Sequence, residues 1–125
     1  MSSNEGESVT DRIVIKDLLL RCVIGANDWE RKVQQDVLIN LEVAADLRPA
    51  GASDDLADAL DYKTMAKRII SMVESSQYFL VEALAEEIAR LCLEDDRAQS
   101  AWVRVEKPGA LRFARSVGVE IHRTQ

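Results

Sequence analysis

Four segments of the chain have the hydrophobic pattern of β-strands. Residues 13–24 form an apolar stretch rich in β-branched side chains that ends at a glycine, which predicts a first strand. Residues 37–44, 101–107 and 117–121 carry apolar residues at alternate positions, as expected for strands with one buried face. Because turn residues separate the first two strands, we expect them to form a hairpin.

Two amphipathic helices are predicted between the two pairs of strands. Apolar residues recur at helical spacing over residues 62–73 and again over residues 80–92. Residues 48–61 are rich in Pro, Gly, Ser and Asp, and Ser53-Asp54-Asp55 is suited to cap a short turn of helix in this connection. The order ββααββ predicts an α+β fold, with a four-stranded antiparallel sheet that carries two helices on one face.

The beginning of the chain differs in composition from the rest. Residues 1–10 are mostly Ser, Glu, Asn and Gly with little to bury, so we expect a disordered tail. The chain has 125 residues, of which 47% are hydrophobic, and this fits a single domain over residues 11–125.

The predicted sheet has edges that a monomer would leave unpaired. The second and the last strands are long and have no obvious edge protection. If subunits joined their sheets into a closed barrel, these edges would disappear and binding sites would lie between chains. We therefore expect a homo-oligomer.

Charge and cysteine content exclude several classes of protein. The chain has 16 Lys and Arg against 22 Asp and Glu, a net charge of −6, which argues against nucleic acid or an anionic membrane as the main partner. No apolar segment reaches membrane-spanning length and a signal peptide is not recognisable, so we expect a cytoplasmic protein. Cys22 and Cys92 lie in apolar surroundings, which predicts buried thiols, and His122 alone cannot form a metal cluster and is most simply a surface group.

Lys107 is the last residue of the third predicted strand, directly before Pro108-Gly109. A rigid strand end can aim an amine at a site, as catalysis requires. A solvated lysine at the end of a strand is the simpler interpretation, and the pattern of this strand alone favours it.

Several short motifs form an ordered set along the chain. They are Ile24-Gly25-Ala26-Asn27-Asp28-Trp29-Glu30, Gln35, Ser53-Asp54-Asp55-Leu56-Ala57-Asp58, Asp61-Tyr62, Leu80-Val81-Glu82-Ala83-Leu84-Ala85-Glu86 and Val105-Glu106-Lys107-Pro108-Gly109-Ala110. Together, from about Asp11 to Arg123, they resemble the dihydroneopterin aldolase family. The resemblance implies the tunnelling fold, in which subunits form a ring whose strands build a β-barrel. It also implies an octamer of two stacked rings, or a single tetrameric ring, with a pterin bound between neighbouring subunits.

The reaction that the resemblance implies belongs to folate biosynthesis. In it, 7,8-dihydroneopterin is cleaved by a retro-aldol step into 6-hydroxymethyl-7,8-dihydropterin and glycolaldehyde. Such a step requires a base for a hydroxyl proton, a sink for the electrons of the broken C–C bond, and an acid that reprotonates carbon. The C=N bond of the dihydropterin ring can be the sink, so that no metal, cofactor or lysine Schiff base is required.

The resemblance assigns catalytic roles to three residues. Lys107 would handle protons through a water molecule, and Tyr62 would stack on the pterin and exchange a proton at the same carbon. Glu30 would orient the diol and the water. The alternatives are an aromatic residue packed on the core for Tyr62 and a surface salt bridge to Arg31 or Lys32 for Glu30.

Substrate binding is assigned by the same resemblance to Glu82, Val81, Leu60 and Tyr62. A carboxylate such as Glu82 can accept two parallel hydrogen bonds from the N–H groups of the amino-pyrimidinone edge of a pterin. The alternative for Glu82 is an acid favoured by the dipole at the start of a helix. Backbone groups of Val81 and Leu60 would complete the contacts to the pterin edge.

Two other functions stay open. The runs 58–64 and 111–117 resemble the sister enzyme, dihydroneopterin triphosphate 2′-epimerase, as much as the aldolase, and Arg112 and Arg115 could bind a triphosphate. Asp28-Trp29-Glu30 and the motif after Glu106 favour the aldolase, and the two activities can coexist. A non-catalytic pterin or purine binder, or a ring-forming interaction module, is the third possibility, although such a module would need neither Lys107 nor Tyr62.

Overall fold

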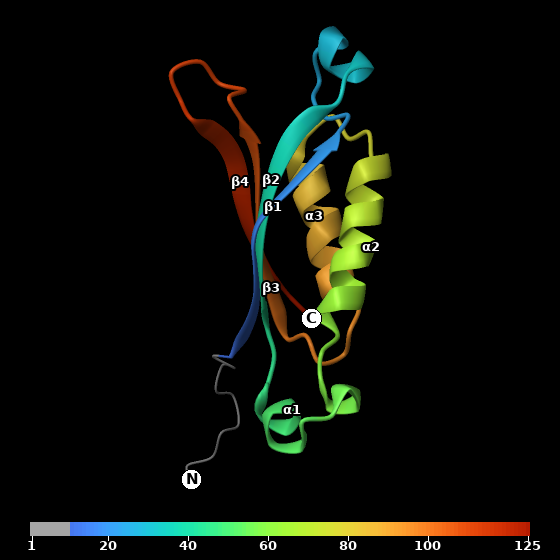
Figure 1. Cartoon of the computed structure of the whole chain (residues 1–125). Coiled ribbons are helices and arrows are strands. Elements are labelled where there is room, and N and C mark those ends of the chain that lie inside the picture. The colour runs from blue at the N-terminus through green and yellow to red at the C-terminus, as the bar shows by residue number, and fades with distance from the viewer. Residues whose placement is uncertain (1–10) are drawn as a thin grey trace.

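The chain forms a four-stranded antiparallel sheet with two long helices packed on one of its faces. The computed structural model describes residues 11–125, so the tail predicted for residues 1–10 lies outside the described residues. The strands follow the order β1-β2-β3-β4 across the sheet, and α2 and α3 lie side by side on one face (Figure 1). In chain order the elements are β1 (Arg12–Cys22), the 3-10 helix η1 (Asp28–Lys32), β2 (Gln35–Ala44), α1 (Arg48–Ser53), the 3-10 helix η2 (Leu56–Asp58), α2 (Tyr62–Ser75), α3 (Val81–Cys92), β3 (Ser100–Pro108) and β4 (Ser116–Thr124). The predicted α+β fold and the ββααββ order of the main elements are confirmed.

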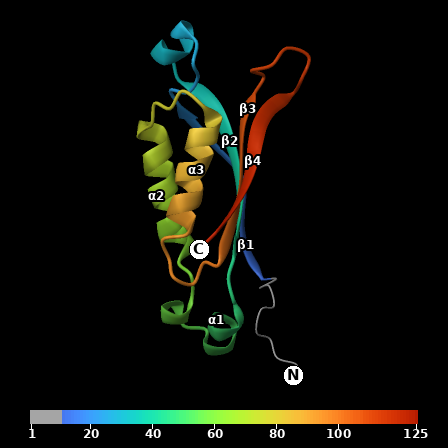
Figure 2. The same cartoon turned by 180° about the vertical axis from the view of Figure 1, so that it is seen from behind.

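The hydrophobic core lies between the sheet and the two long helices. The predicted inward face of β2 is fully buried, and so are the inward positions of β3 and the facing side chains of α2 and α3: Val37, Ile39, Leu41, Val43, Ala101, Val103, Val105, Ile69, Val73, Leu84 and Ile88. The opposite face of the sheet is covered by no element of residues 11–125, as the view from behind shows (Figure 2). One face of each strand therefore builds the core, as the period of two predicts.

A β-bulge interrupts β1 between its two apolar pieces. The register with β2 shifts between Ile15 and Leu18, and Asp17 has a left-handed backbone with φ 57°. The backbone N–H of Asp17 donates to Oδ1 of Asn40, at 2.9 Å. Because the extra residue changes the phase of the alternation, Ile13 and Leu20, on either side of the bulge, both pack against the core.

The connection between β2 and α2 contains more helix than the sequence predicted. The predicted short turn is present as η2, whose N-cap residue Asp55 accepts a hydrogen bond from the N–H of Ala57 at 2.9 Å. The six-residue helix α1 before it was not predicted, although Pro49 in its first turn is a favourable signal. Asp61 caps α2 by accepting from the N–H groups of Lys63 and Thr64.

The edges of the sheet are β1 and β4. The expectation that the second strand would be an edge is wrong, because β2 is paired on both sides, with β1 and with β3. Each of β1 and β4 pairs with a single strand within residues 11–125. The unpaired edges therefore belong to the first and last strands.

Candidate functional site

Glu30 is a buried carboxylate that accepts hydrogen bonds on both oxygens. Only 4% of the surface of Glu30 is exposed to solvent. Oε2 accepts from Nζ of Lys107 at 2.6 Å and from Nε2 of Gln35 at 3.0 Å. Oε1 accepts from the backbone N–H of Asn27 at 3.2 Å and from its Nδ2 at 2.9 Å. The buried charge is thus surrounded by donors, as the cost of burying a carboxylate requires.

The ion pair of Glu30 with Lys107 joins two segments that are 77 residues apart in the sequence. The side chain of Lys107 is 16% exposed and that of Glu30 is 6% exposed. The hydrogen bond from Lys107, followed by that from Gln35, lowers the pKa of Glu30 to about 2. Lys107 is therefore not a solvated strand-end lysine. The alternative of a surface salt bridge from Glu30 to Arg31 or Lys32 is also wrong.

A short connection between β1 and β2 holds Glu30 in place. The N–H of Glu30 donates to the carbonyl of Asn27 at 2.9 Å, and the two residues have the spacing of a capping box. Gly25 has φ +130°, and a Cβ atom at this position would lie 2.1 Å from Cδ of Glu30. A glycine is required here for two reasons, since any side chain would be strained and would also occupy the space of the carboxylate.

The start of α3 lies at the same end of the molecule as the ion pair. The N–H of Gly25 donates to the carbonyl of Tyr78 at 3.2 Å, three residues before α3 begins at Val81. Figure 1 shows the β1–β2 connection and the first turn of α3 at one end of the sheet. Glu82 is exposed on this first turn and makes no ion pair or hydrogen bond with any side chain of residues 11–125.

Tyr62 and Leu60 lie at the other end of the helical layer. Leu60 lines a hollow of about 260 Å³ together with Leu91 and Cys92. These two residues lie at the end of α3, whereas Val81 lies at its start. At 1.5 Å per residue, the length of α3 separates the two ends by about 17 Å. Tyr62 is 60% exposed at the first position of α2 and is not packed in the core. The chain therefore brings Lys107, Glu30, Val81 and Glu82 to one end, and Leu60 and Tyr62 to the other.

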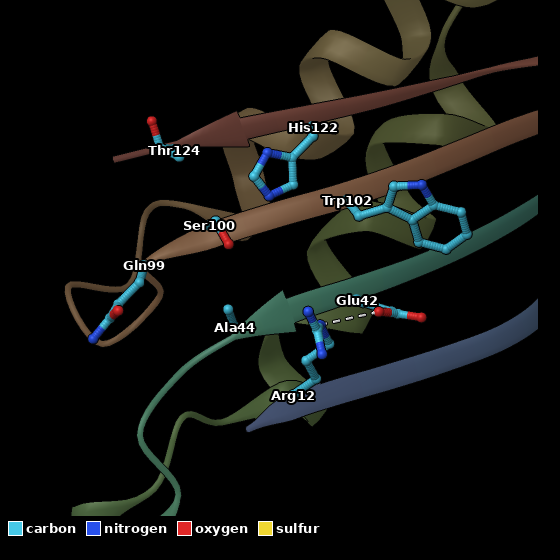
Figure 3. Close-up of a pocket in the computed structure, with 8 residues that line it drawn as sticks. All are labelled: Arg12, Glu42, Ala44, Gln99, Ser100, Trp102, His122 and Thr124. Atoms are coloured by element: carbon cyan, nitrogen blue, oxygen red, sulfur yellow. Dashed lines mark ion pairs between the residues drawn. The ribbon is translucent and has the colours of Figure 1, made fainter. Parts of the chain in front are cut away.

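A second hollow, of about 490 Å³, lies on the face of the sheet that no helix of residues 11–125 covers (Figure 3). An ion pair of 3.2 Å between Arg12 and Glu42 crosses it, and Trp102 and His122 line it. His122 is an exposed strand residue, as predicted. None of the predicted site residues lines this hollow. Residues 11–125 contain no group of three or more His, Cys, Asp or Glu side chains that could hold a metal ion.

Comparison with known proteins decides the family. The profile of the family "FolB: Dihydroneopterin aldolase" matches residues 13–122 of the chain. This chain belongs to the dihydroneopterin aldolase family. The fold, the family and the resemblance noted in the sequence agree.

Relatives of the chain have three different names. The chain is 43% identical to the dihydroneopterin aldolase of Escherichia coli over 115 residues, which is 90% of this chain and 93% of that protein. It is 42% identical to the dihydroneopterin triphosphate 2′-epimerase of Pseudomonas aeruginosa over 110 residues, covering 88% of this chain and 89% of the relative. It is also 40% identical over 114 residues to the folic acid synthesis protein FOL1 of Dictyostelium discoideum, with 91% of this chain matched, but the chain spans only 17% of that longer protein.

Solved structures of family members superpose closely on the chain. The E. coli dihydroneopterin aldolase in complex with neopterin gives a TM-score of 0.87 at 38% identity, covering 91% of this chain and 99% of the other. A Burkholderia dihydroneopterin aldolase bound to guanine gives a TM-score of 0.80 at 25% identity, with coverage of 98% and 99%. The α+β sheet and helix arrangement is thus that of the family.

Two residues of the site had no role in the sequence analysis. Gln35 was used only as part of a motif, and the structure shows that its Nε2 bridges Oε2 of Glu30 and the carbonyl of Ile24, at 3.0 and 2.7 Å. Asn27 binds the other carboxylate oxygen. The spacing of Asn27 and Glu30 was a readable capping signal, whereas no local pattern pairs Glu30 with Lys107.

Proposed function

We propose that the chain is a dihydroneopterin aldolase, which cleaves 7,8-dihydroneopterin into 6-hydroxymethyl-7,8-dihydropterin and glycolaldehyde. The observation that carries the proposal is the buried pair of Lys107 and Glu30, 2.6 Å apart, beside the start of a helix with an unpaired carboxylate. It is supported by the aldolase of E. coli, which is similar to this chain over 93% of its length.

Glu82 is proposed to bind the amino-pyrimidinone edge of the pterin. The relatives in the solved structures hold neopterin and guanine, and these two ligands share this edge. A carboxylate without a protein partner can accept two parallel hydrogen bonds from the ring N–H and the amino group. Backbone groups of Val81, and of Leu60 from a neighbouring chain, would complete the contacts.

Lys107 is proposed to move protons, and Glu30 to hold it in place. A base takes the proton of the 2′-hydroxyl, the C1′–C2′ bond breaks, and its electrons move into the C=N bond of the ring. Glycolaldehyde leaves, and a proton delivered to C1′ restores the ring and gives the hydroxymethyl product. Lys107 with a bound water carries these protons, and the ionised Glu30 fixes the amine at the rigid end of β3. Tyr62 stacks on the pterin and exchanges a proton at C1′.

The site is proposed to be shared between chains. Tyr62 and Leu60 lie about 17 Å from the start of α3 along the helices, so one chain cannot supply both halves of a small pterin site. The unpaired edges of β1 and β4 support a closed ring in which the strands of neighbouring subunits pair. We propose a tetrameric ring, or two such rings stacked as an octamer, with each site built from two chains.

A direct assay tests the activity. The purified protein is incubated with dihydroneopterin and with its triphosphate, and the products are separated by chromatography. Glycolaldehyde and hydroxymethyl-dihydropterin from dihydroneopterin support the aldolase, whereas release from neither substrate refutes it and favours a non-catalytic binding module. Lys107→Ala should lower turnover far more than pterin affinity, and Glu82→Ala should chiefly abolish binding. Glu86→Ala, an exposed acid one turn further along α3, is the matched control.

Covalent trapping tests the proposed role of Lys107. Borohydride reduces a Schiff base to a stable amine, so a substrate-dependent adduct on Lys107 would refute the proton-carrier role. No adduct is expected.

Mixing two variants of low activity tests the shared site. If Lys107 and Tyr62 of one site come from different chains, co-expressed Lys107→Ala and Tyr62→Phe chains form rings in which roughly a quarter of the sites are intact. The mixture should therefore be more active than either variant alone. A mixture no more active than its components would place both residues of a site on one chain.

The epimerase is the second candidate, favoured by Arg112 and Arg115. Every other arginine of residues 11–125 pairs with a carboxylate or donates to a backbone carbonyl. Arg112 and Arg115 have no such acceptor within those residues, and both lie in the β3–β4 loop that follows Lys107. Two unpaired guanidinium groups suit a triphosphate. Epimer formed without hydroxymethyl-dihydropterin, and lost in the Arg112→Ala/Arg115→Ala variant, would establish this function instead.

We also propose a cytoplasmic location. Both cysteines are free and buried, which fits a reducing compartment. Among residues 11–125, no helix has the length and apolar character needed to span a membrane. Detection of the protein in the cytosolic fraction of its host cells would check the location.

A further inference from the structure

Arg31 links the loop that carries Glu30 to the loop that leads into Glu82, within one chain. It follows Glu30 directly in η1, but its guanidinium group turns to the loop between α2 and α3. Nη1 donates to the carbonyls of Gly25 and Tyr78, at 2.9 and 3.0 Å, and Nη2 donates to the carbonyl of Gln77 at 2.5 Å. One side chain thus binds the loop that carries Glu30 and the loop that leads into Val81 and Glu82.

Two further contacts strengthen this link. The carbonyl of Tyr78 also accepts from the N–H of Gly25, so it is shared between the backbone and Arg31. The guanidinium carbon of Arg31 lies 4.0 Å from the centroid of the Phe79 ring, a cation–π distance. Arg31 is half-buried and makes no ion pair with any carboxylate of residues 11–125. Within these residues, the guanidinium group of Arg31 therefore donates its hydrogen bonds to backbone carbonyls.

We infer that Arg31 is a positioning residue, which fixes the start of α3, and with it Glu82, relative to the Glu30–Lys107 pair. The inference rests on the proposed pterin site, because it concerns the distance between the binding carboxylate and the catalytic amine. The guanidinium group donates from two nitrogens: Nη1 joins the two loops, and Nη2 adds the carbonyl of Gln77. The ammonium group of lysine has its three donors on one nitrogen and lacks this planar fork, so it would keep only part of these contacts.

The position of α3 matters because the pterin is held by one segment and reacts at another. A displacement of about 1 Å of a bound substrate can cost about 100-fold in rate. In residues 11–125, one backbone hydrogen bond joins these two loops, from the N–H of Gly25 to the carbonyl of Tyr78. Without Arg31, this bond alone would hold them together. The loop before α3 would then move relative to Lys107, and both the affinity and the rate would fall.

The test compares Arg31→Ala and Arg31→Lys with Arg90→Ala in the assembled full-length protein. Arg90 lies on α3, and its replacement removes the same charge together with hydrogen bonds to Glu87 and Glu94, but Arg90 contacts neither loop. For Arg31→Ala we expect roughly tenfold weaker neopterin binding and at least about tenfold lower kcat at a temperature where the fold is intact. Low concentrations of guanidinium should restore part of both, Arg31→Lys should recover only part, and Arg90→Ala should change neither.

Hydrogen exchange provides a readout that does not depend on activity. The amide of Gly25 donates to Tyr78, so it should exchange faster in Arg31→Ala than in the unmodified chain, and as slowly as normal in Arg90→Ala. Unchanged exchange at Gly25 together with unchanged binding and kcat would overturn the inference. If binding and kcat fall in Arg31→Ala, guanidinium does not restore them and Arg90→Ala shows the same fall, the effect is one of general stability. This result would also overturn the inference. An unmodified protein that neither binds neopterin nor cleaves dihydroneopterin would refute the proposed function, while the exchange result would still decide whether Arg31 holds the loops.

Discussion

Glu30→Gln is the substitution that most directly tests the buried ion pair. Glutamine has the shape of glutamate, but it has one acceptor oxygen and one NH2 group in place of two acceptor oxygens. In the unmodified protein, one carboxylate oxygen of Glu30 accepts from Lys107 and Gln35, and the other accepts from two donors of Asn27. In either orientation the NH2 group meets two donors, so two hydrogen bonds are lost and Lys107 stays half-buried without its counter-ion.

The magnitude follows from the pKa of Glu30. Its fall from 4.5 to about 2 in the folded protein corresponds, at 1.36 kcal/mol per unit, to about 3 kcal/mol of stability at neutral pH. Breaking a buried pair by removing one partner typically costs about 3–5 kcal/mol, in agreement. We therefore expect Glu30→Gln to lower the free energy of unfolding by about 3 kcal/mol at pH 7.

The pH dependence has a definite sign. Because the folded pKa of Glu30 is depressed, its stabilisation is complete above the unfolded value of about 4.5 and is lost as the pH falls through about 2. The difference in unfolding free energy between the unmodified protein and Glu30→Gln should thus be constant above pH 5 and shrink between pH 4.5 and pH 2. Other carboxylates titrate in both proteins and cancel in the difference.

Urea denaturation of both proteins at a fixed protein concentration, from pH 7 to pH 2, measures this difference. Glu86→Gln is the control, because Glu86 is paired with Arg123 at the surface with 53% of its side chain exposed, and its loss should cost less than about 1 kcal/mol. A difference for Glu30→Gln below about 1 kcal/mol at pH 7, or one that does not change down to pH 2, would refute the stabilising role of the pair.

Three further predictions concern other parts of the molecule. Gly25→Ala should lower both the melting temperature and kcat, because its Cβ would lie 2.1 Å from Cδ of Glu30; unchanged thermal unfolding and turnover would contradict the packing described for this loop. Tyr62→Phe should leave the melting temperature within a few degrees of normal, since Tyr62 is 60% exposed, and should lower turnover about tenfold or more in the chromatographic assay. Burial raises the pKa of Cys92 to about 12, so at pH 8 this thiol should react with iodoacetamide only after unfolding, as mass spectrometry of the native and the denatured protein would show.

The main elements of the fold could be predicted from the sequence because their signals are local. Val37, Ile39 and Leu41 stand at alternate positions, which places one face of β2 in the core, and helical spacing does the same for one face of α2 and of α3. The short helix α1 escaped prediction since six residues carry too little periodicity. Of the two expected edges, the last strand was right and the second strand was wrong, because strand order depends on the crossover through the helices.

The candidate site also has features that the sequence predicts and features that only the tertiary structure shows. The sequence by itself placed Lys107 near the end of a strand and Glu82 near the start of a helix, although β3 continues through Pro108. It also contains the capping spacing of Asn27 and Glu30, which the sequence analysis did not use. Only the tertiary structure decided that Glu30 pairs with Lys107 and not with its neighbour Arg31, since the two partners meet through strand pairing across 77 residues. It also decided that Tyr62 lies at the far end of the helices from Glu82. The physical reason is that local patterns fix which face a residue occupies, whereas long-range packing fixes which residues meet.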